Sequence, residues 1–474
     1  MYTRETIERL NKDLKKFPQI FPITPDMKIT HKGVSRLIML ERYAFKDIEK
    51  LTLKENDLVV LTIKEDTKFP ARGVGIIKEI DWQTHEGTVL VDEEFRGQLD
   101  NPEEAKTGIV TRNLDLIDKP LELFYEQIAK RNSKGLSDVE ETEEKRAEWF
   151  EKFYHELVNL NFIPAGRVIY GAGTGKNVTY FNCYVMPFPK DSREGLGDYR
   201  KEVMEIMSRG GGVGTNGTTL RPRNALAKGV NGKSSGAVSW LDDIAKLTHL
   251  VEQGGSRRGA QMMMMADFHP DIIEFIISKM QNPKILQAVI ANTKDKQIKI
   301  AAKNKLKFEP LTQQERQTYE AALKDAGIDE KLRKEIEKKL TDGGKYTVNN
   351  PDFLSGANIS VCLTDEFMDA VEKNKKYALR FPDLESYNEE EMKFYNEHWH
   401  EIGDVREWEA LGYKVKTYRT IKAKDLWSLI NICATYSAEP GIFFIDNANI
   451  MTNAKAYGQK VVATNPCGKW LASR

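Results

Sequence analysis

The sequence lacks an excess of charge of either sign, since its 474 residues contain 71 Lys and Arg against 71 Asp and Glu. A balanced chain presents no field that would attract nucleic acid or an anionic membrane, so we expect neither as a partner, although a local site could bind a free nucleotide. Long apolar runs are also missing: the longest, residues 58–63 and 441–445, are far too short to cross a bilayer. The first residues carry no apolar signal segment, and we expect a soluble cytoplasmic protein.

Cysteine is scarce, with only Cys183, Cys362, Cys433 and Cys467 in the chain. Four cysteines in a chain of this length do not indicate a disulfide framework, and no CxxC pair or Cys/His spacing typical of a metal site is present. The neighbours of Cys362 and Cys433 are mostly apolar, and we interpret both as core residues. Any cysteine of functional importance is therefore expected to act chemically, in a reducing compartment.

Hydrophobic periodicity divides the chain into segments and favours an α/β fold class for most of it. Helical spacing dominates the start, short β-rich runs follow, and strand, glycine-rich turn and helix then alternate. The expected segments are a helical one at residues 1–49, a small β-rich module at 50–118, a helical region at 119–180, and an α/β domain at 181–474 with a charged surface insertion near 283–350 and a loop at 464–469.

Two capping patterns predict where helices begin. Ser137 with Glu140 predicts a helix that runs from there towards Leu160. Thr312 with Glu315 predicts a helix inside the insertion. The charged run at residues 329–339 is typical of a solvated helix face and not of a binding patch.

Three glycine-rich stretches, at residues 210–216, 229–236 and 253–260, are candidates for ligand binding. Glycine lets a backbone approach a ligand closely and leaves its N–H groups free for anions, but the same stretches also fit plain tight turns. Arg257 and Arg258 suit phosphate and base recognition, or are simply solvated arginines of a surface loop.

A short motif near the end of the sequence places Cys467 between Pro466 and Gly468, two residues after Asn465. This context suggests a thiol displayed on a turn. A buried structural cysteine is the alternative interpretation of the same residues.

Taken together and in order, these motifs resemble the catalytic subunits of ribonucleotide reductases. The form Asn-Pro-Cys-Gly at 465–468 is similar to the adenosylcobalamin-dependent class (class II), because the oxygen-dependent class usually has another tetrapeptide there. The motifs are FNCYV at 181–185, GGGVG at 210–214, LRP at 220–222, KSSG at 233–236, QGGSRRGA at 253–260, HPDI at 269–272, NISV at 358–361, EPG at 439–441 and NPCG at 465–468.

The resemblance implies a fold and a set of catalytic residues. The fold is the first half of a ten-stranded α/β barrel, with the radical cysteine on a finger loop inside it. Cys467 matches the cysteine on which adenosylcobalamin generates a thiyl radical that takes the 3′ hydrogen of the ribose. Asn465 matches a residue that hydrogen-bonds the ribose, and Cys183 one of two cysteines that reduce the 2′ carbon. The residues matched to substrate binding are Asn182, Gly212, Pro466 and Gly468.

The resemblance also implies a regulatory site and several partners. Asp191, Ser208 and Arg221 match contacts of a deoxynucleotide effector, and we expect them to lie near one another. Gln253, Arg257 and Arg258 lie in the stretch that matches the loop between effector and substrate base. The implied partners are a ribonucleoside di- or triphosphate substrate, the effector, a second copy in a homodimer and a thioredoxin-type reductant.

The chain departs from the family pattern after Gly468. The family has a glutamate at the next position, which takes the 3′ hydroxyl proton; here Lys469 occupies it and cannot accept a proton at neutral pH unless strongly desolvated. The second redox cysteine and the second half-barrel are also absent, so we expect an interrupted or split gene whose second chain or segment completes the barrel. The alternatives are a nucleotide-binding remnant without activity and the large subunit of an oxygen-dependent reductase.

Overall fold

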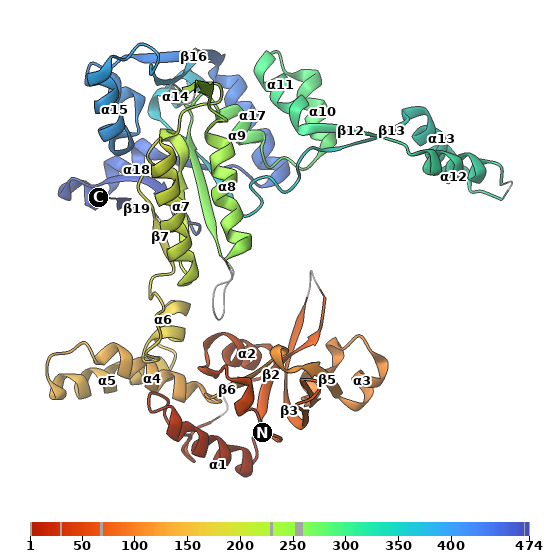
Figure 1. The fold of residues 1–474 in the computed structure, drawn as a ribbon, viewed down its shortest axis with the longest axis vertical. Helices are drawn as coiled ribbons and strands as arrows, with labels where there is room; N and C mark the ends of the chain where they lie inside the picture. Colours follow the sequence, from red (N-terminus) through yellow and green to blue (C-terminus); the bar gives the residue numbers. More distant parts are fainter. Residues whose placement is uncertain are drawn as a thin grey trace. The chain divides into compact units, whose positions relative to one another are not determined.

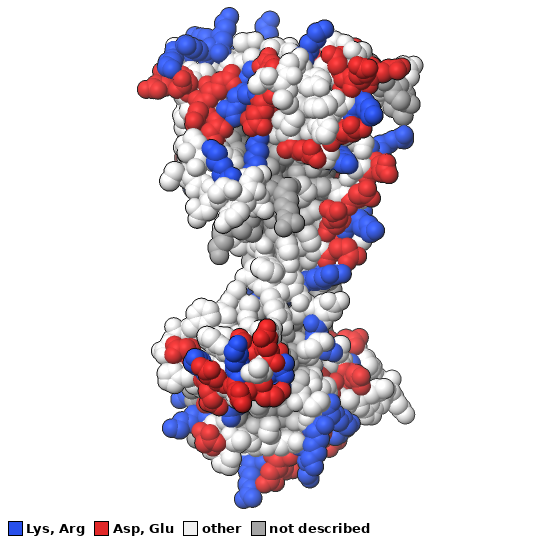
Figure 2. All heavy atoms as spheres, turned by 90° about the vertical axis from the view of Figure 1, so that its left-hand side faces the viewer, with Lys and Arg blue, Asp and Glu red and all other residues white. Residues whose placement is uncertain are grey.

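The computed structural model describes residues 2–28, 31–66, 70–227, 231–251, 259–325, 327–468 and 470–473. The chain forms two compact units, and the boundary between them in the sequence lies between Asn182 and Cys183 (Figure 1). Across the described ranges, no helix is long and apolar enough to span a membrane. Acidic and basic side chains are mixed on the face shown in Figure 2, as expected from the balanced composition.

The first unit is built around a six-stranded antiparallel sheet in the order β1-β6-β2-β3-β4-β5. The β-rich runs predicted between residues 50 and 118 form most of it. β2 is rich in Val and Leu and is buried along nearly its whole length, whereas β4 alternates buried and more exposed positions, as a strand with one face on the core does. The strands are β1 (Lys46–Asp47), β2 (Leu58–Lys64), β3 (Ala71–Asp81), β4 (Glu86–Val91), β5 (Ile109–Asn113) and β6 (Ile117–Pro120).

Several helices of the first unit share one hydrophobic core with this sheet. The prediction of a mostly helical start is wrong for residues 17–28, which contain no helix. Pro18, Pro22 and Pro25 explain the break, because proline lacks the N–H that a helix interior requires. The helices are α1 (Arg4–Asp13), α2 (Gly33–Ile38), α3 (Pro102–Thr107), α4 (Tyr125–Ser137), α5 (Glu143–Val158) and α6 (Gly166–Gly171).

The helix start predicted at Ser137 is wrong. Ser137 is instead the last residue of α4; it is buried, and its Oγ donates to the carbonyl of Lys134 at 3.1 Å. The next helix, α5, begins at Glu143 and is capped by Thr142, whose hydroxyl accepts from the N–H of Lys145. The local Ser-x-x-Glu pattern was overridden because α4 extends to Ser137 against the core of its own unit.

The second unit contains a five-stranded sheet in which every neighbouring pair is parallel, in the order β17-β14-β11-β8-β7. β8 and β11 are buried at every position, as expected for central strands covered on both faces. The α/β pattern predicted from residue 181 onward is therefore confirmed. The strands are β7 (Cys183–Val185), β8 (Gly212–Asn216), β11 (Gln261–Ala266), β14 (Asn358–Leu363) and β17 (Gly441–Phe444).

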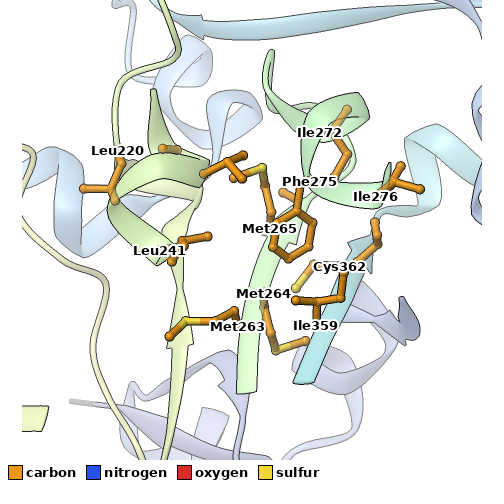
Figure 3. Close-up of a cluster of buried hydrophobic side chains, with 14 of the residues drawn as sticks. Leu220, Leu241, Met263, Met264, Met265, Ile272, Phe275, Ile276, Ile359 and Cys362 are labelled. Carbon is orange, nitrogen blue, oxygen red and sulfur yellow. The ribbon is translucent and has the colours of Figure 1, made fainter. Parts of the chain in front are cut away.

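Helices α7 (Arg193–Ser208), α8 (Ala237–Leu250) and α9 (Ile272–Ile277) pack against one face of this sheet. Met263 and Met265 of β11 join Leu241 of α8 and Phe275 of α9 in the core of the unit (Figure 3). Because side chains alternate along a strand, Met264 points to the opposite face. That second face carries the candidate functional site.

The segment at residues 283–350 has two parts. The helix predicted from Thr312 and Glu315 is confirmed, since each residue's side chain accepts from the backbone N–H of the other. Of α13 only Ile336 is buried, in keeping with a solvated charged face. The helices α10 and α11, however, bury Leu286 and Ile298 in the core of the unit and are not surface additions. The elements are α10 (Pro283–Asn292), α11 (Lys296–Lys305), β12 (Leu306–Pro310), α12 (Gln313–Leu323), α13 (Glu330–Asp342) and β13 (Gly344–Val348).

The remaining elements complete the second unit. An antiparallel pair of strands, β15 and β16, follows α14, and two short hairpin pairs, β9 with β10 and β18 with β19, lie elsewhere in the chain. The elements are β9 (Leu226–Ala227), β10 (Gly232–Lys233), α14 (Asp365–Glu372), β15 (Lys376–Pro382), α15 (Glu389–Ile402), α16 (Val405–Ala410), β16 (Val415–Lys422), α17 (Ala423–Ser437), α18 (Ile445–Met451), β18 (Lys460–Thr464) and β19 (Trp470–Ser473).

Candidate functional site

Two cysteines meet at the edge of the parallel sheet. Cys183 is the first residue of β7, and Cys467 lies on the turn that follows β18. Their Sγ atoms are 3.8 Å apart although 284 residues separate them in the sequence. The structure therefore brings together the two cysteines to which the sequence motifs assign chemistry.

The glycine run explains how the turn reaches the sheet. In β8, Gly212, Gly214 and Asn216 share one face, while Val213 and Thr215 face the helices, as the bond from Tyr199 of α7 to Thr215 shows. A Cβ at Gly214 would collide with the carbonyl oxygen of Thr464. The absence of side chains at Gly212 and Gly214 thus allows β18, which is not a strand of this sheet, to pack directly against it.

Gly212, two residues before Gly214 in β8, has the same role and lies nearer to the two thiols. A Cβ built at Gly212 would lie 3.1 Å from Cys183 Sγ and 3.1 Å from Pro466 Cγ. Cys183 is paired in register with Gly212, so both point to the face that carries β18. The glycine run therefore allows close contact with another segment of the same chain. The interpretation of residues 210–216 as a plain turn is wrong for Gly212 to Asn216, which form β8.

Asn465 shapes the turn that displays the thiol. Its side chain is buried, and its Oδ1 accepts from the backbone N–H of Cys467 at 3.0 Å. Gly468 closes the turn with a bond to the carbonyl of Asn465, at a positive φ of 75° that favours glycine. Cys467 itself is exposed, so its interpretation as a displayed thiol is confirmed.

The other two cysteines are buried, as predicted. Cys362 is 1% exposed and Cys433 is 2% exposed. Burial raises the pKa of Cys433 to about 12, and burial, and next the nearby Asp267 carboxylate, raise the pKa of Cys362 well above its usual range. Neither thiol forms a thiolate readily at neutral pH.

Two asparagines to which the sequence motifs assigned no role hold β18. Asn449 takes the place of a neighbouring strand: its Oδ1 accepts from the N–H of Val461 and its Nδ2 donates to the same residue's carbonyl, at 2.8 and 2.9 Å. Asn216 donates from Nδ2 to the carbonyl of Val462 at 2.6 Å. The sequence contained a signal for Asn216, because it ends the glycine run and alternation along the strand places it on the same face as Gly212 and Gly214. Nothing near Asn449 in the sequence indicates its role.

Of the proposed effector residues that the structure describes, it brings together Asp191 and Arg221 but not Ser208. Arg221 Nε donates to Asp191 Oδ2 at 2.7 Å, and its backbone N–H donates to Oδ1 of the same carboxylate. Tyr395 of α15, which the sequence did not suggest, also donates to Asp191 Oδ2 at 2.7 Å. Burial, and next the Asp191 charge, raise the pKa of Tyr395 well above its usual range, so it stays a donor.

The expected proximity of Ser208 to Asp191 is wrong within one chain. Asp191 precedes α7 and Ser208 ends it, and a helix of 16 residues is about 24 Å long. Ser208 Oγ donates to the carbonyl of Glu205 in its own helix. Gln253, Arg257 and Arg258 lie outside the described residues.

The HPDI motif and Asn182 differ in their surroundings. The buried ring of His269 bonds the carbonyl of Leu220 at 2.9 Å and accepts from the N–H of Asp271, whose carboxylate accepts from the N–H groups of Arg223 and Ala237. The HPDI motif thus ties the turns between β8 and α8 to the start of α9. Asn182 ends the first unit, and its buried Oδ1 has no hydrogen-bond partner among the described residues.

The parallel sheet agrees with the α/β class that the sequence predicted, and the turn of Cys467 lies beside its edge strand. The chain belongs to the ribonucleotide reductase family: the family described as ribonucleotide reductase, barrel domain, matches residues 181–472. The family described as ribonucleotide reductase, all-alpha domain, matches residues 112–177.

Several curated proteins are similar to the chain. A vitamin B12-dependent ribonucleoside-diphosphate reductase of Thermoplasma acidophilum is 23% identical over 462 residues, which cover 96% of this chain and 44% of that protein. One of the same description from Mycobacterium tuberculosis is 33% identical over 138 residues, 29% of this chain and 20% of that protein. A ribonucleoside-diphosphate reductase subunit alpha of Chlamydia pneumoniae is 25% identical over 344 residues, 72% of this chain and 26% of that protein. The chain thus spans less than half the length of these relatives.

Proposed function

We propose that the chain is the radical-bearing part of the catalytic subunit of a cytoplasmic adenosylcobalamin-dependent ribonucleotide reductase. The observation that carries the proposal is the approach of Cys183 and Cys467 to 3.8 Å at the edge of the parallel sheet. Ribonucleotide reduction uses one thiol to take a hydrogen atom from the ribose and another to reduce it, so two thiols must reach one substrate. Membership of the family and the names of the B12-dependent relatives support the same assignment.

In this proposal the residues of the turn and of the adjacent strands have separate roles. Cys467, as a thiyl radical, takes the 3′ hydrogen atom of the ribose and later returns it. Cys183 supplies one of the two electrons that replace the 2′ hydroxyl by hydrogen. Asn465 holds the Cys467 backbone and faces the ribose. The residues proposed to line the substrate are Asn182, Gly212, Pro466 and Gly468.

The described residues fit adenosylcobalamin in one respect: the Cys467 side chain is exposed on its turn, where a bulky organic group can reach the sulfur. Such a cofactor supplies the initial radical by homolysis of its cobalt–carbon bond. We assign no described residue to the corrin ring, and the role of Cys467 is to receive the radical and pass it to the ribose.

The proposal includes partners beyond this chain. The five-stranded sheet forms one half of a ten-stranded barrel, and a further segment or second chain supplies the other half together with the second redox cysteine. A thioredoxin-type protein reduces the cysteine pair after each turnover. The substrate is a ribonucleoside di- or triphosphate, and a deoxynucleotide effector binds at Asp191 and Arg221, near the contact of a homodimer, with Gln253, Arg257 and Arg258 between effector and substrate.

A second candidate function is nucleotide binding without turnover. Lys469 favours it, because an ammonium at the position of the expected glutamate cannot take the 3′ hydroxyl proton. The two functions differ in what Lys469→Glu does: it allows turnover in the first and changes nothing in the second.

The test combines Lys469→Glu with a segment that completes the barrel. We expect deoxyribonucleotide formation only when adenosylcobalamin is added, and none in the same protein with Cys467→Ser. Cys183→Ser should stop multiple turnover and leave cobalt–carbon homolysis intact, because Cys183 acts after hydrogen abstraction. Turnover without cobalamin would contradict the proposal and favour the oxygen-dependent class.

A further inference from the structure

The contact between Cys183 and Cys467 has a chemical consequence apart from catalysis. Two thiols at 3.8 Å are within hydrogen-bonding distance of each other. A disulfide needs its sulfurs about 2.05 Å apart, so these two must close by roughly 1.8 Å. Cys467 is exposed on a turn, where rotation of its side chain can provide much of that movement.

The surroundings of the two sulfurs leave room for this closure. Gly212 lies beside them without a side chain, where a Cβ would already sit 3.1 Å from Cys183 Sγ. The backbone of Cys467 is held by Asn465, and β18 is held by Asn216 and Asn449, so the turn stays beside β7. The two thiols therefore meet at a high effective concentration that the fold itself maintains.

No other pair of cysteines competes in the folded chain. Cys362 and Cys433 are each buried, and burial raises the pKa of both thiols. Since the thiolate is the reactive form, neither is available to an oxidant in water.

We propose that Cys183 and Cys467 form an intramolecular disulfide on two-electron oxidation. The step removes one proton and one electron from each thiol and joins the sulfurs, and a mild diazene oxidant such as diamide takes up both protons and both electrons to become the hydrazine. A dithiol reverses it by exchange. If the proposed function is right, this disulfide removes the thiol that must carry the radical, and the oxidised chain is inactive until it is reduced.

The test uses the chain alone, reduced and then treated with stoichiometric diamide at low protein concentration. Free thiols are counted after denaturation, and the linked peptides are identified by mass spectrometry without reduction. We expect the thiol count to fall from four to two, a single monomeric product and one linked pair, Cys183 with Cys467. Linkage of other cysteines, covalent dimers or an unchanged count would overturn the proposal.

The same reaction in concentrated urea is the control for the role of the fold. In an unfolded chain, closing the loop of 284 residues is disfavoured relative to the much shorter loop between Cys433 and Cys467, by roughly 20-fold. In urea we therefore expect the main linked pair to change from Cys183 with Cys467 to Cys433 with Cys467. An identical pattern in buffer and in urea would overturn the proposal, because it would mean that the fold does not select the pair.

Variants separate the two thiols from the rest. Cys362→Ser with Cys433→Ser should leave the identity of the linked pair, Cys183 with Cys467, unchanged. Either Cys183→Ser or Cys467→Ser should abolish it. These readouts need no cofactor, substrate or second chain, so failure of the proposed function would leave this result intact, and failure of the disulfide would not by itself remove the proposed function.

Discussion

Asn216 ties the second strand of the parallel sheet to the strand that leads into the cysteine turn, since its Nδ2 donates to the carbonyl of Val462 at 2.6 Å across 246 residues. The orientation of the amide follows from its other bonds. The backbone N–H of Thr218 can only donate, so the amide atom that accepts it is Oδ1; Thr218 Oγ1 donates to the same oxygen, and Nδ2 faces the carbonyl of Val462. This buried chain of bonds sets the position of β18 without a regular ladder to the sheet.

Asn216→Ala should loosen that strand. The change leaves the carbonyl of Val462 buried without its donor, which costs about 1–3 kcal/mol in the free energy of unfolding. We also expect slower formation of the disulfide between Cys183 and Cys467, because the turn is less well held. Asn292→Ala is the control: Asn292 is exposed and its Nδ2 donates to the carbonyl of Ala288 in its own helix, so stability should change by less than about 0.5 kcal/mol. If Asn216→Ala and Asn292→Ala lowered the free energy of unfolding in urea by the same amount, the role of Asn216 would be contradicted.

Gly214→Ala should displace β18 from the sheet. The added Cβ meets a backbone oxygen, that of Thr464, which cannot turn away as a side chain could. We expect a loss of about 1–3 kcal/mol in stability, as for other overpacked cores, and a large drop in the yield of the disulfide. Gly197→Ala is the matched control, because nothing lies within 4 Å of its Cβ position in α7 and alanine favours helix by up to about 1 kcal/mol. Formation of the disulfide between Cys183 and Cys467 at the parent rate in Gly214→Ala would show that Thr464 does not lie close against Gly214.

Arg221→Ala should weaken deoxynucleotide binding. The guanidinium pairs with Asp191 and, through Nη1, with the carbonyl of Leu226, so it is held in place beside the proposed effector site. Loss of a charge-assisted contact to phosphate costs roughly 1.5–3 kcal/mol. Calorimetric titration with deoxynucleoside triphosphates measures it.

Two controls locate that site. Arg223→Ala removes a neighbouring arginine whose guanidinium is paired with Glu274, and we expect binding close to the parent value. Ser208→Ala should also have no effect on a site confined to one chain, because Ser208 ends α7 far from Asp191. A loss caused by Ser208→Ala would instead indicate that two copies share the effector, and indifference to Arg221→Ala would move the site to the loop of Arg257 and Arg258.

Asp267 should make stability depend on pH. Burial raises its pKa to about 7, although hydrogen bonds from Thr364 and Tyr377 favour the carboxylate. The unfolded chain loses this proton near pH 4 and the folded chain only near pH 7, so between these values stability falls as pH rises, by up to about 1.4 kcal/mol per unit. Above about pH 7 the contribution of Asp267 is lost and the slope ends.

Asp267→Asn should remove that slope in urea unfolding measured from about pH 4 to pH 8, because an amide of the same shape does not titrate. The control is Asp369→Asn, which removes an exposed carboxylate paired with Lys373 and should keep the slope of the parent chain. A slope that persists in Asp267→Asn would assign it to another group.

Several features of the site could be predicted from the sequence, because they depend on residues close together in the chain. The cap formed by Thr312 and Glu315 and the turn around Cys467 are of this kind, each made by side chains that bond backbone groups two or three residues away. The apolar neighbours of Cys362 and Cys433 likewise predicted their burial. The order of the motifs was enough to indicate the family, since it needs no coordinates.

Tertiary structure alone decided the rest. The sequence showed an acidic residue at 191 and an arginine at 221, but the bond to Tyr395, 204 residues away, and the distance from Ser208 follow from how α15 and α7 pack. Ser137 had the residues of a helix start and became a helix end, because burial of α4 outweighed a local pattern worth about 1 kcal/mol. The sequence by itself determined which groups are available; contacts between distant segments, each favourable only once the hydrophobic core has formed, determined which of them meet.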